Sequence, residues 1–182
     1  MLLGTPRCDF GTAAPDFDLA TPTGARYTRS ALMGENGLLV AFICNHCPYV
    51  VAQIDRLASD AKDLQLARIG VVFIMSNDYT EHPADAPDMM DAFAQKHRFT
   101  APYLIDEDQT VARAYGAVCT PDFFGYDAKG GLQYRGRLDN LGMRGDQAGR
   151  VPELINAMQQ IAATGQTSLP QSAAMGCSIK WR

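Results

Sequence analysis

Two cysteines three positions apart, Cys44 and Cys47, are the residues of this chain best suited to chemistry. They follow an unbroken apolar run over residues 38–43 and precede Pro48, which suits the first turn of a helix because its missing N–H is not needed there. The pattern predicts a buried strand that delivers both cysteines to a helix N-terminus. Unpaired N–H groups and the helix dipole favour a thiolate there, and the pKa of a cysteine falls from about 8.5 to roughly 3.5–7.5 in such motifs. We therefore expect Cys44 to have a pKa below that of free cysteine.

The two residues between the cysteines are candidates for a supporting role. His46 lies directly before the second cysteine, and as an imidazolium it would further stabilise the thiolate of Cys44. A more stable reduced form makes the disulfide a stronger oxidant. The alternative is a solvent-exposed histidine without effect. Asn45 completes the motif and is grouped with His46 and Pro48 as a supporting residue.

The pair has three competing interpretations: a redox dithiol, half of a zinc site, or two inert buried thiols. A zinc site usually needs a second Cys or His pair at short spacing. The other cysteines, Cys8, Cys119 and Cys177, occur singly. A strand–helix–strand context favours the redox interpretation. We expect no metal, and no cofactor besides the redox-active disulfide itself.

Composition places the chain among ordinary globular proteins. Its 182 residues fit one domain over 1–182, with a polar tail at 165–182, and 47% of the residues are hydrophobic. Net charge is −4 without a run of lysine or arginine, so we expect no nucleic-acid or membrane partner. The apolar start is too short for a signal peptide and no apolar stretch approaches a membrane span, so the expected location is the cytoplasm.

Apolar periodicity and turn residues predict the order of elements. Strands and helices alternate before a late hairpin and a closing helix, which predicts an α/β protein with a mixed central sheet and helices on both faces. The predicted elements are a hairpin over 12–33, strands at 38–43, 69–75 and 103–105, a loop over 77–87, a hairpin over 123–137, and helices at 48–66, 88–97, 108–115 and 151–161.

Four segments resemble a known family. They are Ala14-Pro15-Asp16-Phe17, the stretch from Cys44 to Val50, Thr120-Pro121 before a late strand, and the closing run at 176–181. On these segments the chain resembles thioredoxin-fold proteins and, more narrowly, the peroxiredoxin-like branch of the redoxin (AhpC/TSA) family, over 14–163. The resemblance implies a thioredoxin-like fold with an N-terminal β-hairpin.

The resemblance also implies roles for individual residues. The Thr120–Pro121 bond would be cis and lie against the dithiol, where Pro121 would shape the substrate groove. Cys44 would be the attacking thiolate that forms a mixed disulfide, and the less exposed Cys47 would resolve it. The implied activity is that of a thiol-disulfide oxidoreductase. Its partners would be protein or small-molecule disulfides or thiols, together with a reducing system.

Departures from the family pattern leave alternatives open. The buried aspartate that thioredoxins hold before the dithiol is replaced by Ala41, so the proton of Cys47 needs another acceptor. The threonine and proline that peroxiredoxins place before the peroxidatic cysteine are replaced by Ala41 and Gly37, and Thr120-Pro121 stands where their arginine is expected. A peroxidase with antioxidant activity is therefore the alternative. A non-enzymatic redox sensor or metal-binding module is a further alternative.

Two of the single cysteines are candidate additional thiols. Cys119 lies one residue before Thr120, so it is either a third thiol near the dithiol or a small buried side chain. Cys177 lies in the tail and is either a resolving thiol, a bridge between chains, or a thiol without a role. His82 and His97 show no ligand spacing, and we expect them at surface positions without a function.

Overall fold

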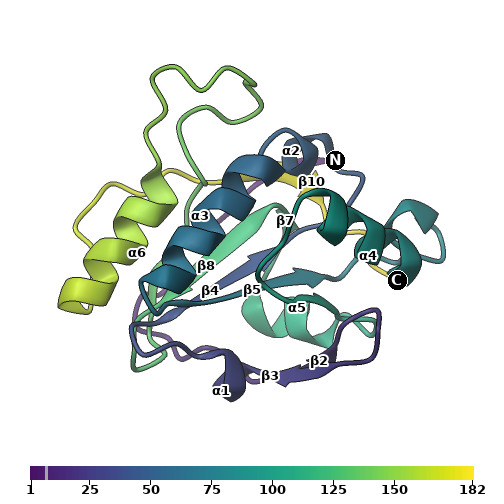
Figure 1. The fold of residues 1–182 in the computed structure, drawn as a ribbon, viewed down its shortest axis with the longest axis horizontal. Coiled ribbons are helices and arrows are strands. Elements are labelled where there is room, and N and C mark those ends of the chain that lie inside the picture. Colours follow the sequence, from purple (N-terminus) through teal and green to yellow (C-terminus); the bar gives the residue numbers. More distant parts are fainter. Residues whose placement is uncertain (7) are drawn as a thin grey trace.

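The computed structural model describes residues 1–6 and 8–182 and shows a mixed sheet with helices on both faces (Figure 1). The seven-stranded sheet has the order β3-β2-β6-β5-β4-β8-β9. β4 pairs in parallel with β5, and β5 with β6, whereas β8 and β9 continue the sheet in antiparallel fashion. Its strands are β2 (Asp18–Ala20), β3 (Arg26–Thr28), β4 (Leu38–Phe42), β5 (Gly70–Met75), β6 (Tyr103–Ile105), β8 (Asp122–Tyr126) and β9 (Leu132–Tyr134).

The central strands are buried on both faces, which is why their sequences are continuously apolar. Alternate residues of β4 enter two different cores. Leu39 and Ala41 pack with α3, α4 and α6, while Val40 and Phe42 pack with α5 and the N-terminal segment. The helices are α1 (Arg29–Leu32), α2 (Pro48–Val51), α3 (Ile54–Leu66), α4 (Pro87–Lys96), α5 (Thr110–Tyr115) and α6 (Glu153–Thr164), with a 3-10 turn, η1 (Pro83–Asp85).

The helix after the dithiol differs from its prediction. One helix was expected over 48–66, but the chain forms α2 and then α3 with a break between them. The N–H of Gln53 bonds to the carbonyl of Val50, three residues back, which tightens the turn and redirects the chain. The single turn α2 beside the two cysteines is therefore a separate element from α3.

The tail returns to the dithiol region through a second, three-stranded sheet. Its order is β1-β10-β7, formed by β1 (Leu2–Gly4), β10 (Met175–Ser178) and β7 (Cys119–Thr120). In Figure 1 the yellow β10 lies beside α2 and the N-terminus. The register places Cys177 opposite Thr120. Both chain ends thus meet the segment that precedes Pro121.

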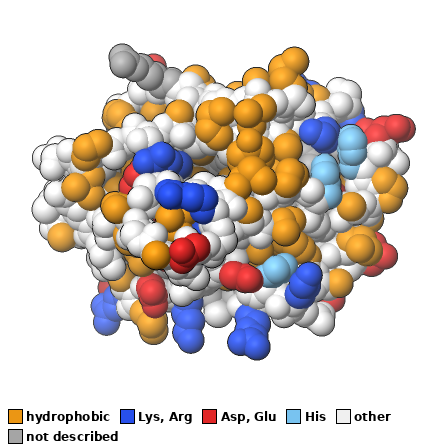
Figure 2. Space-filling model, turned by 90° about the horizontal axis from the view of Figure 1, so that it is seen from above, with side chains coloured by type: hydrophobic (Ala, Val, Ile, Leu, Met, Phe, Trp, Pro, Cys, Tyr) orange, Lys and Arg blue, Asp and Glu red, His pale blue; other side chains and the backbone are white. Residues whose placement is uncertain are grey.

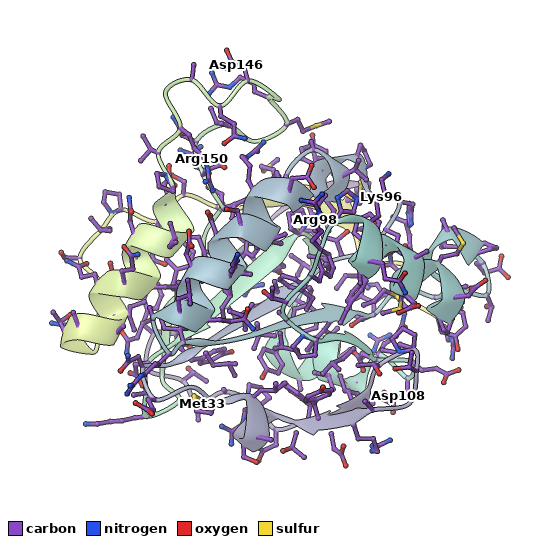
Figure 3. The ribbon with its side chains drawn as sticks, viewed as in Figure 1. Met33, Lys96, Arg98, Asp108, Asp146 and Arg150 are labelled. Atoms are coloured by element: carbon purple, nitrogen blue, oxygen red, sulfur yellow. The ribbon has the colours of Figure 1, made fainter. Side chains whose placement is uncertain are left out.

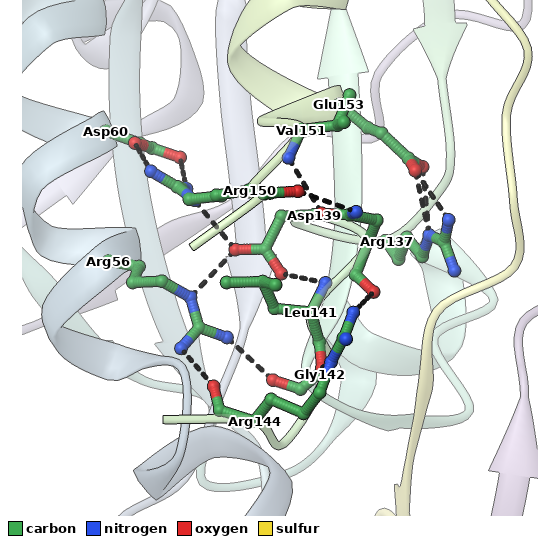
Figure 4. A network of polar contacts seen from close by, with 12 residues as sticks. Arg56, Asp60, Arg137, Asp139, Leu141, Gly142, Arg144, Arg150, Val151 and Glu153 are labelled. Carbon is green, nitrogen blue, oxygen red and sulfur yellow. Dashed lines mark hydrogen bonds and ion pairs between the residues drawn. The ribbon is translucent and has the colours of Figure 1, made fainter. Parts of the chain in front are cut away.

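A buried ionic network fixes the long loop between β9 and α6. Asp139 Oδ2 accepts hydrogen bonds from Arg56 at 2.8 Å and from Arg150 at 2.9 Å, and Arg150 also pairs with Asp60 on α3 (Figure 4). Figure 3 shows Asp146 at the outer tip of this loop and Arg150 closer to the body of the protein. The network ties the base of the loop to α3.

Among the described residues, no helix combines the length and the apolar character needed to cross a membrane.

Candidate active site

The two cysteines lie where β4 ends and α2 begins. Cys47 is the residue that caps α2, Pro48 is the first helical residue, and the carbonyl of Cys47 accepts the N–H groups of Val50 and Val51. All five cysteines of the chain are free thiols. The sulfur-bearing residues are nearly inaccessible, with 1% of Cys44 and 0% of Cys47 exposed. Greater exposure was expected for Cys44, and the structure does not provide it, because the surrounding side chains cover both thiols.

Thr120 contacts both sulfurs. Its Oγ1 lies 3.3 Å from Cys44 Sγ, and its carbonyl oxygen accepts a hydrogen bond from Cys47 Sγ at 3.1 Å. The peptide bond between Thr120 and Pro121 is cis, as the family resemblance predicted. The late proline segment therefore lies against the dithiol, although 73 residues separate Thr120 from Cys47 in the sequence.

The charge of the pair rests on a different cysteine from the one predicted. The hydrogen bond with Cys47 and burial raise the pKa of Cys44 well above that of a free thiol, while the hydroxyl of Thr120 lowers it. The hydrogen bond from Cys44 lowers the pKa of Cys47 to about 4, with help from backbone N–H groups of Cys177 and Val50, against the effect of burial. The expectation of a lowered pKa for Cys44 is thus wrong, because the hydrogen bond between the two sulfurs and the burial of Cys44 keep the proton on Cys44.

The surroundings of the pair can accommodate the proton on either sulfur. N–H groups of Val50 and Cys177 favour a thiolate on Cys47. The two groups of Thr120 favour the opposite arrangement, since its hydroxyl can donate to a Cys44 thiolate and its carbonyl can accept from a Cys47 thiol. A single proton can therefore move between the sulfurs without leaving either one unpartnered.

A buried carboxylate lies beside the motif. Asp85, at the end of η1, has no exposed surface and accepts hydrogen bonds from the N–H of Asn45 and from Asn77 Nδ2, both at 2.8 Å. Burial acts to raise the pKa of Asp85, but contacts with His46, Asn77 and Asn45 outweigh it and lower that pKa. The carboxylate therefore stays ionised although it has no contact with solvent. It is a buried acid close to the motif, although it comes from η1 and not from β4.

His46 lies between this carboxylate and the surface. Its Nδ1 is 2.8 Å from Asp85 Oδ2, but it has no well-directed hydrogen-bond acceptor, so the contact is primarily an ion pair. The contact with Asp85 raises the pKa of His46. The ring stacks on His82, with centroids 5.4 Å apart. His82 therefore lies beside the motif, at the partly exposed position that the sequence predicted for it.

Donor atoms of Cys44, His46 and Asp85 all lie within 4.8 Å of one another. A thiolate, an imidazole and a carboxylate are ligands that zinc accepts. Within residues 1–6 and 8–182, these three residues form the group that could hold a metal ion. Binding would compete with the ion pair between His46 and Asp85, which is already formed.

The two additional thiols have different surroundings. Cys119 is fully buried, its sulfur faces the carbonyl of Pro121 at 3.6 Å, and burial raises its pKa far above that of a free thiol. Cys177 is partly exposed and packs against the core beside the dithiol, and burial together with the neighbouring Cys47 raises its pKa. The structure thus brings Cys177 to the dithiol and leaves Cys119 behind it.

Several residues of the site carry no signal in the sequence. Asp85, Asn77 and His82 lie in the segment predicted as a polar loop, and Tyr103 on β6 donates a hydrogen bond to Asn45 Oδ1 at 3.1 Å. The one clue in the sequence was Ala41, which leaves the acid expected in the strand before the dithiol missing. Only the folded chain shows that the acid comes from this loop.

Exposed hydrophobic side chains lie on the elements next to the dithiol. Leu2, Val51 and Met175 are each about half exposed, and they come from β1, α2 and β10. Figure 2 shows hydrophobic side chains gathered into a patch next to neighbouring histidines.

Comparisons with known proteins agree with this architecture. A family model described as "AhpC/TSA family" matches residues 10–135. A hypothetical protein from Sinorhizobium meliloti 1021 has a solved structure with 35% identity and a TM-score of 0.90, covering 98% of each chain. An uncharacterized conserved protein from Geobacillus kaustophilus has 33% identity and a TM-score of 0.92, covering 100% of this chain and 97% of that one.

A more distant structure shows the fold alone. A putative thiol:disulfide interchange protein DsbE from Chlorobium tepidum is 20% identical, with a TM-score of 0.63 over 86% of this chain and 99% of that one. No protein with a curated description matches the chain. The fold is thioredoxin-like, as the resemblance predicted. The chain belongs to the AhpC/TSA family.

Proposed function

We propose that this protein is a thiol-disulfide oxidoreductase in which Cys44 and Cys47 cycle between dithiol and disulfide. The observation that carries the proposal is the contact of both sulfurs with Thr120, through its hydroxyl at 3.3 Å and its carbonyl at 3.1 Å. These contacts hold two thiols next to each other at a helix N-terminus, where a thiolate is stabilised.

The first step is attack by Cys44 on a substrate disulfide. In the resting pair Cys47 holds the negative charge, and Cys44 gives its proton to Cys47 along the hydrogen bond between them as it attacks. Thr120 stabilises the result, because its carbonyl accepts from the new Cys47 thiol. One sulfur of the substrate becomes bonded to Cys44, and the other leaves as a thiolate.

The second step releases the reduced substrate. The leaving thiolate takes the proton of Cys47, whose thiolate then attacks Cys44 Sγ and displaces the second substrate sulfur. The protein now holds a Cys44–Cys47 disulfide, and the substrate has gained two electrons. A reducing partner returns the protein to the dithiol by the reverse exchange.

Cys44 is assigned as the attacking sulfur because of what surrounds each thiol. Cys47 is enclosed by Thr120 and Cys177, whereas Cys44 lies beside the half-buried His46 and its neighbour His82. A substrate reaches Cys44 only when these side chains move, since 1% of the residue is exposed. The exposed hydrophobic side chains of Leu2, Val51 and Met175 support polypeptide disulfides as substrates, because such a surface binds apolar residues of a partner chain.

The test is turnover of insulin or of DTNB, driven by a reductase, in matched variants. Cys44→Ser is expected to lose activity, and Cys47→Ser to accumulate mixed disulfides with its substrates. Cys119→Ser is the control and should retain activity, because Cys119 faces away toward the carbonyl of Pro121. Wild-type turnover by Cys44→Ser would exclude the proposed mechanism.

The same preparations separate the two alternatives. NADPH-coupled loss of hydrogen peroxide without disulfide reduction would indicate a peroxidase. The proposal disfavours this outcome, because Thr120-Pro121 stands where peroxiredoxins are expected to carry their arginine, and it is Thr120 that contacts both sulfurs. Stoichiometric zinc bound to the purified protein, with neither activity, would indicate a metal-binding module formed by Cys44, His46 and Asp85.

A further inference from the structure

A third thiol lies next to the proposed dithiol. Cys177 is on β10, and the antiparallel register pairs it with Thr120, the residue that contacts both active-site sulfurs. Cys177 packs against the hydrophobic cluster that contains Cys44 and Cys47, and it lies near enough to Cys47 for each thiol to affect the pKa of the other. Cys47 therefore has a sulfur neighbour on each side.

The strand that carries Cys177 is held close to the site by its neighbours. A Cβ atom at Gly176 would lie 2.2 Å from the carbonyl oxygen of Thr120, so only glycine permits this approach. Just before the strand, Ala174 and Thr5 exchange hydrogen bonds. Just after it, the N–H of Lys180 donates to Asn77 Oδ1 at 2.9 Å. Cys177 is thus fixed in place.

We propose that Cys177 is a third redox-active cysteine, which attacks the Cys44–Cys47 disulfide at Cys47 and converts it into a Cys47–Cys177 disulfide. This inference rests on the proposed function, because the oxidised dithiol is its starting point. The Sγ–Sγ bond between Cys47 and Cys177 forms as the bond between Cys44 and Cys47 breaks, and the electron pair leaves on Cys44 Sγ. The proton lost by Cys177 is taken up by Cys44, so the exchange neither gains nor loses electrons.

The exchange would move the oxidised bond toward the surface. Cys44 and Cys47 are almost completely covered, whereas Cys177 is partly exposed on an outer sheet. A reducing partner could then attack Cys177 without entering the substrate site, while Cys44 has already returned to its thiol. Oxidation and reduction would use different faces of the same thiol cluster.

Cys119 does not compete for this role. It lies on β7 directly before Thr120, but its sulfur is fully buried and faces the carbonyl of Pro121. Cys119 therefore provides a matched control, because it is a cysteine of the same sheet whose side chain does not reach the surface.

The experiment is oxidation of the Cys44→Ser variant with one equivalent of diamide, followed by thiol counting in denaturant and peptide mapping under non-reducing conditions. The variant keeps four of the five cysteines. We expect two thiols to be lost and a peptide pair linking Cys47 to Cys177 within one chain. Cys44→Ser/Cys119→Ser should behave in the same way, and Cys44→Ser/Cys177→Ser should lose the link.

Other outcomes would overturn the inference. It fails if the Cys44→Ser variant keeps its four thiols, if Cys47 pairs with Cys119, or if Cys177 links two chains. Wild-type protein oxidised in parallel separates this failure from that of the proposed function. A Cys44–Cys47 disulfide in wild type without Cys47–Cys177 in the variant rejects only the third cysteine, whereas wild type that forms no disulfide rejects both. If the variant does not fold, peptide mapping of wild-type protein at limiting diamide is the test instead. Both the Cys44–Cys47 and the Cys47–Cys177 disulfides are expected there, and the absence of Cys47–Cys177 would reject the inference.

Discussion

His46 Nδ1 lies 2.8 Å from Oδ2 of Asp85, a carboxylate without exposed surface, 39 residues further along the chain. Three polar neighbours lower the pKa of Asp85, and the contact with Asp85 in turn raises the pKa of His46 next to the dithiol. The pair thus places a buried carboxylate and a titratable imidazole beside the motif, from a segment distant in the sequence.

The ion pair predicts a pH-dependent charge on His46. Asp85 raises the pKa of His46, so the imidazolium and its stabilising contribution persist below that pKa and are lost as the pH rises through it. Asp85→Asn should lower the pKa of His46 by about 1 unit or more, because an opposite charge at this distance is removed. An NMR titration of the histidine ring protons measures the change.

A second His–Asp contact provides the control for this titration. His97 Nδ1 lies 2.7 Å from Asp55, on the surface of α3. Asp55→Asn should leave the titration of His46 where it is in wild type. If Asp85→Asn does the same, the pair does not set the charge of His46.

The dithiol should remain ionised in mild acid. Because the pKa of Cys47 is about 4, its thiolate becomes protonated only as the pH falls through that value. Thiolate absorbance at 240 nm should therefore persist through pH 5–6. In Cys44→Ala the midpoint should move upward, because the hydrogen bond from Cys44 is the largest cause of the lowered pKa. Cys119→Ala should titrate like wild type, and a wild-type midpoint near 8.5 would contradict the assignment.

The network around Asp139 should contribute strongly to stability. Asp139→Ala leaves the buried Arg56 without its carboxylate partner and removes one of the two carboxylates that pair with the partly buried Arg150. Removing one partner of a buried ion pair costs about 3–5 kcal/mol. Urea unfolding followed by circular dichroism measures the loss. Glu35→Ala is the matched control, because its ion pair with Arg68 is largely exposed and such pairs contribute about 0–1 kcal/mol. Equal losses in the two variants would refute the role of the network.

Gly176 should tolerate no side chain. In Gly176→Ala the new Cβ would meet the carbonyl of Thr120 at 2.2 Å, so β10 or the dithiol segment has to shift. We expect a loss of about 1–3 kcal/mol in the free energy of unfolding, typical of overpacked sites, together with a slower formation of any Cys47–Cys177 bond. Gly145→Ala, with open space around its Cβ, should change neither quantity. A Gly176→Ala variant as stable as wild type would show that β10 is not closely packed here.

The sequence alone was sufficient for the elements that local patterns encode. The apolar run before Cys44, the proline after Cys47 and the turn residues around each strand act over a few positions, so they predicted the strand, the helix start and the α/β order correctly. The cis bond at Pro121 followed from the family resemblance, because its local sequence is compatible with either isomer.

Tertiary structure decided which cysteine carries the charge and which residues support it. Helix spacing indicated a thiolate near Cys44, but the N–H of Cys177 comes from a strand more than a hundred residues away and favours Cys47. In the sequence, Asp85 is one polar loop residue among several. Only the fold brings it, at the end of η1, into contact with His46. Such contacts join residues distant in the chain, and their energies depend on burial and on partners that packing alone brings together.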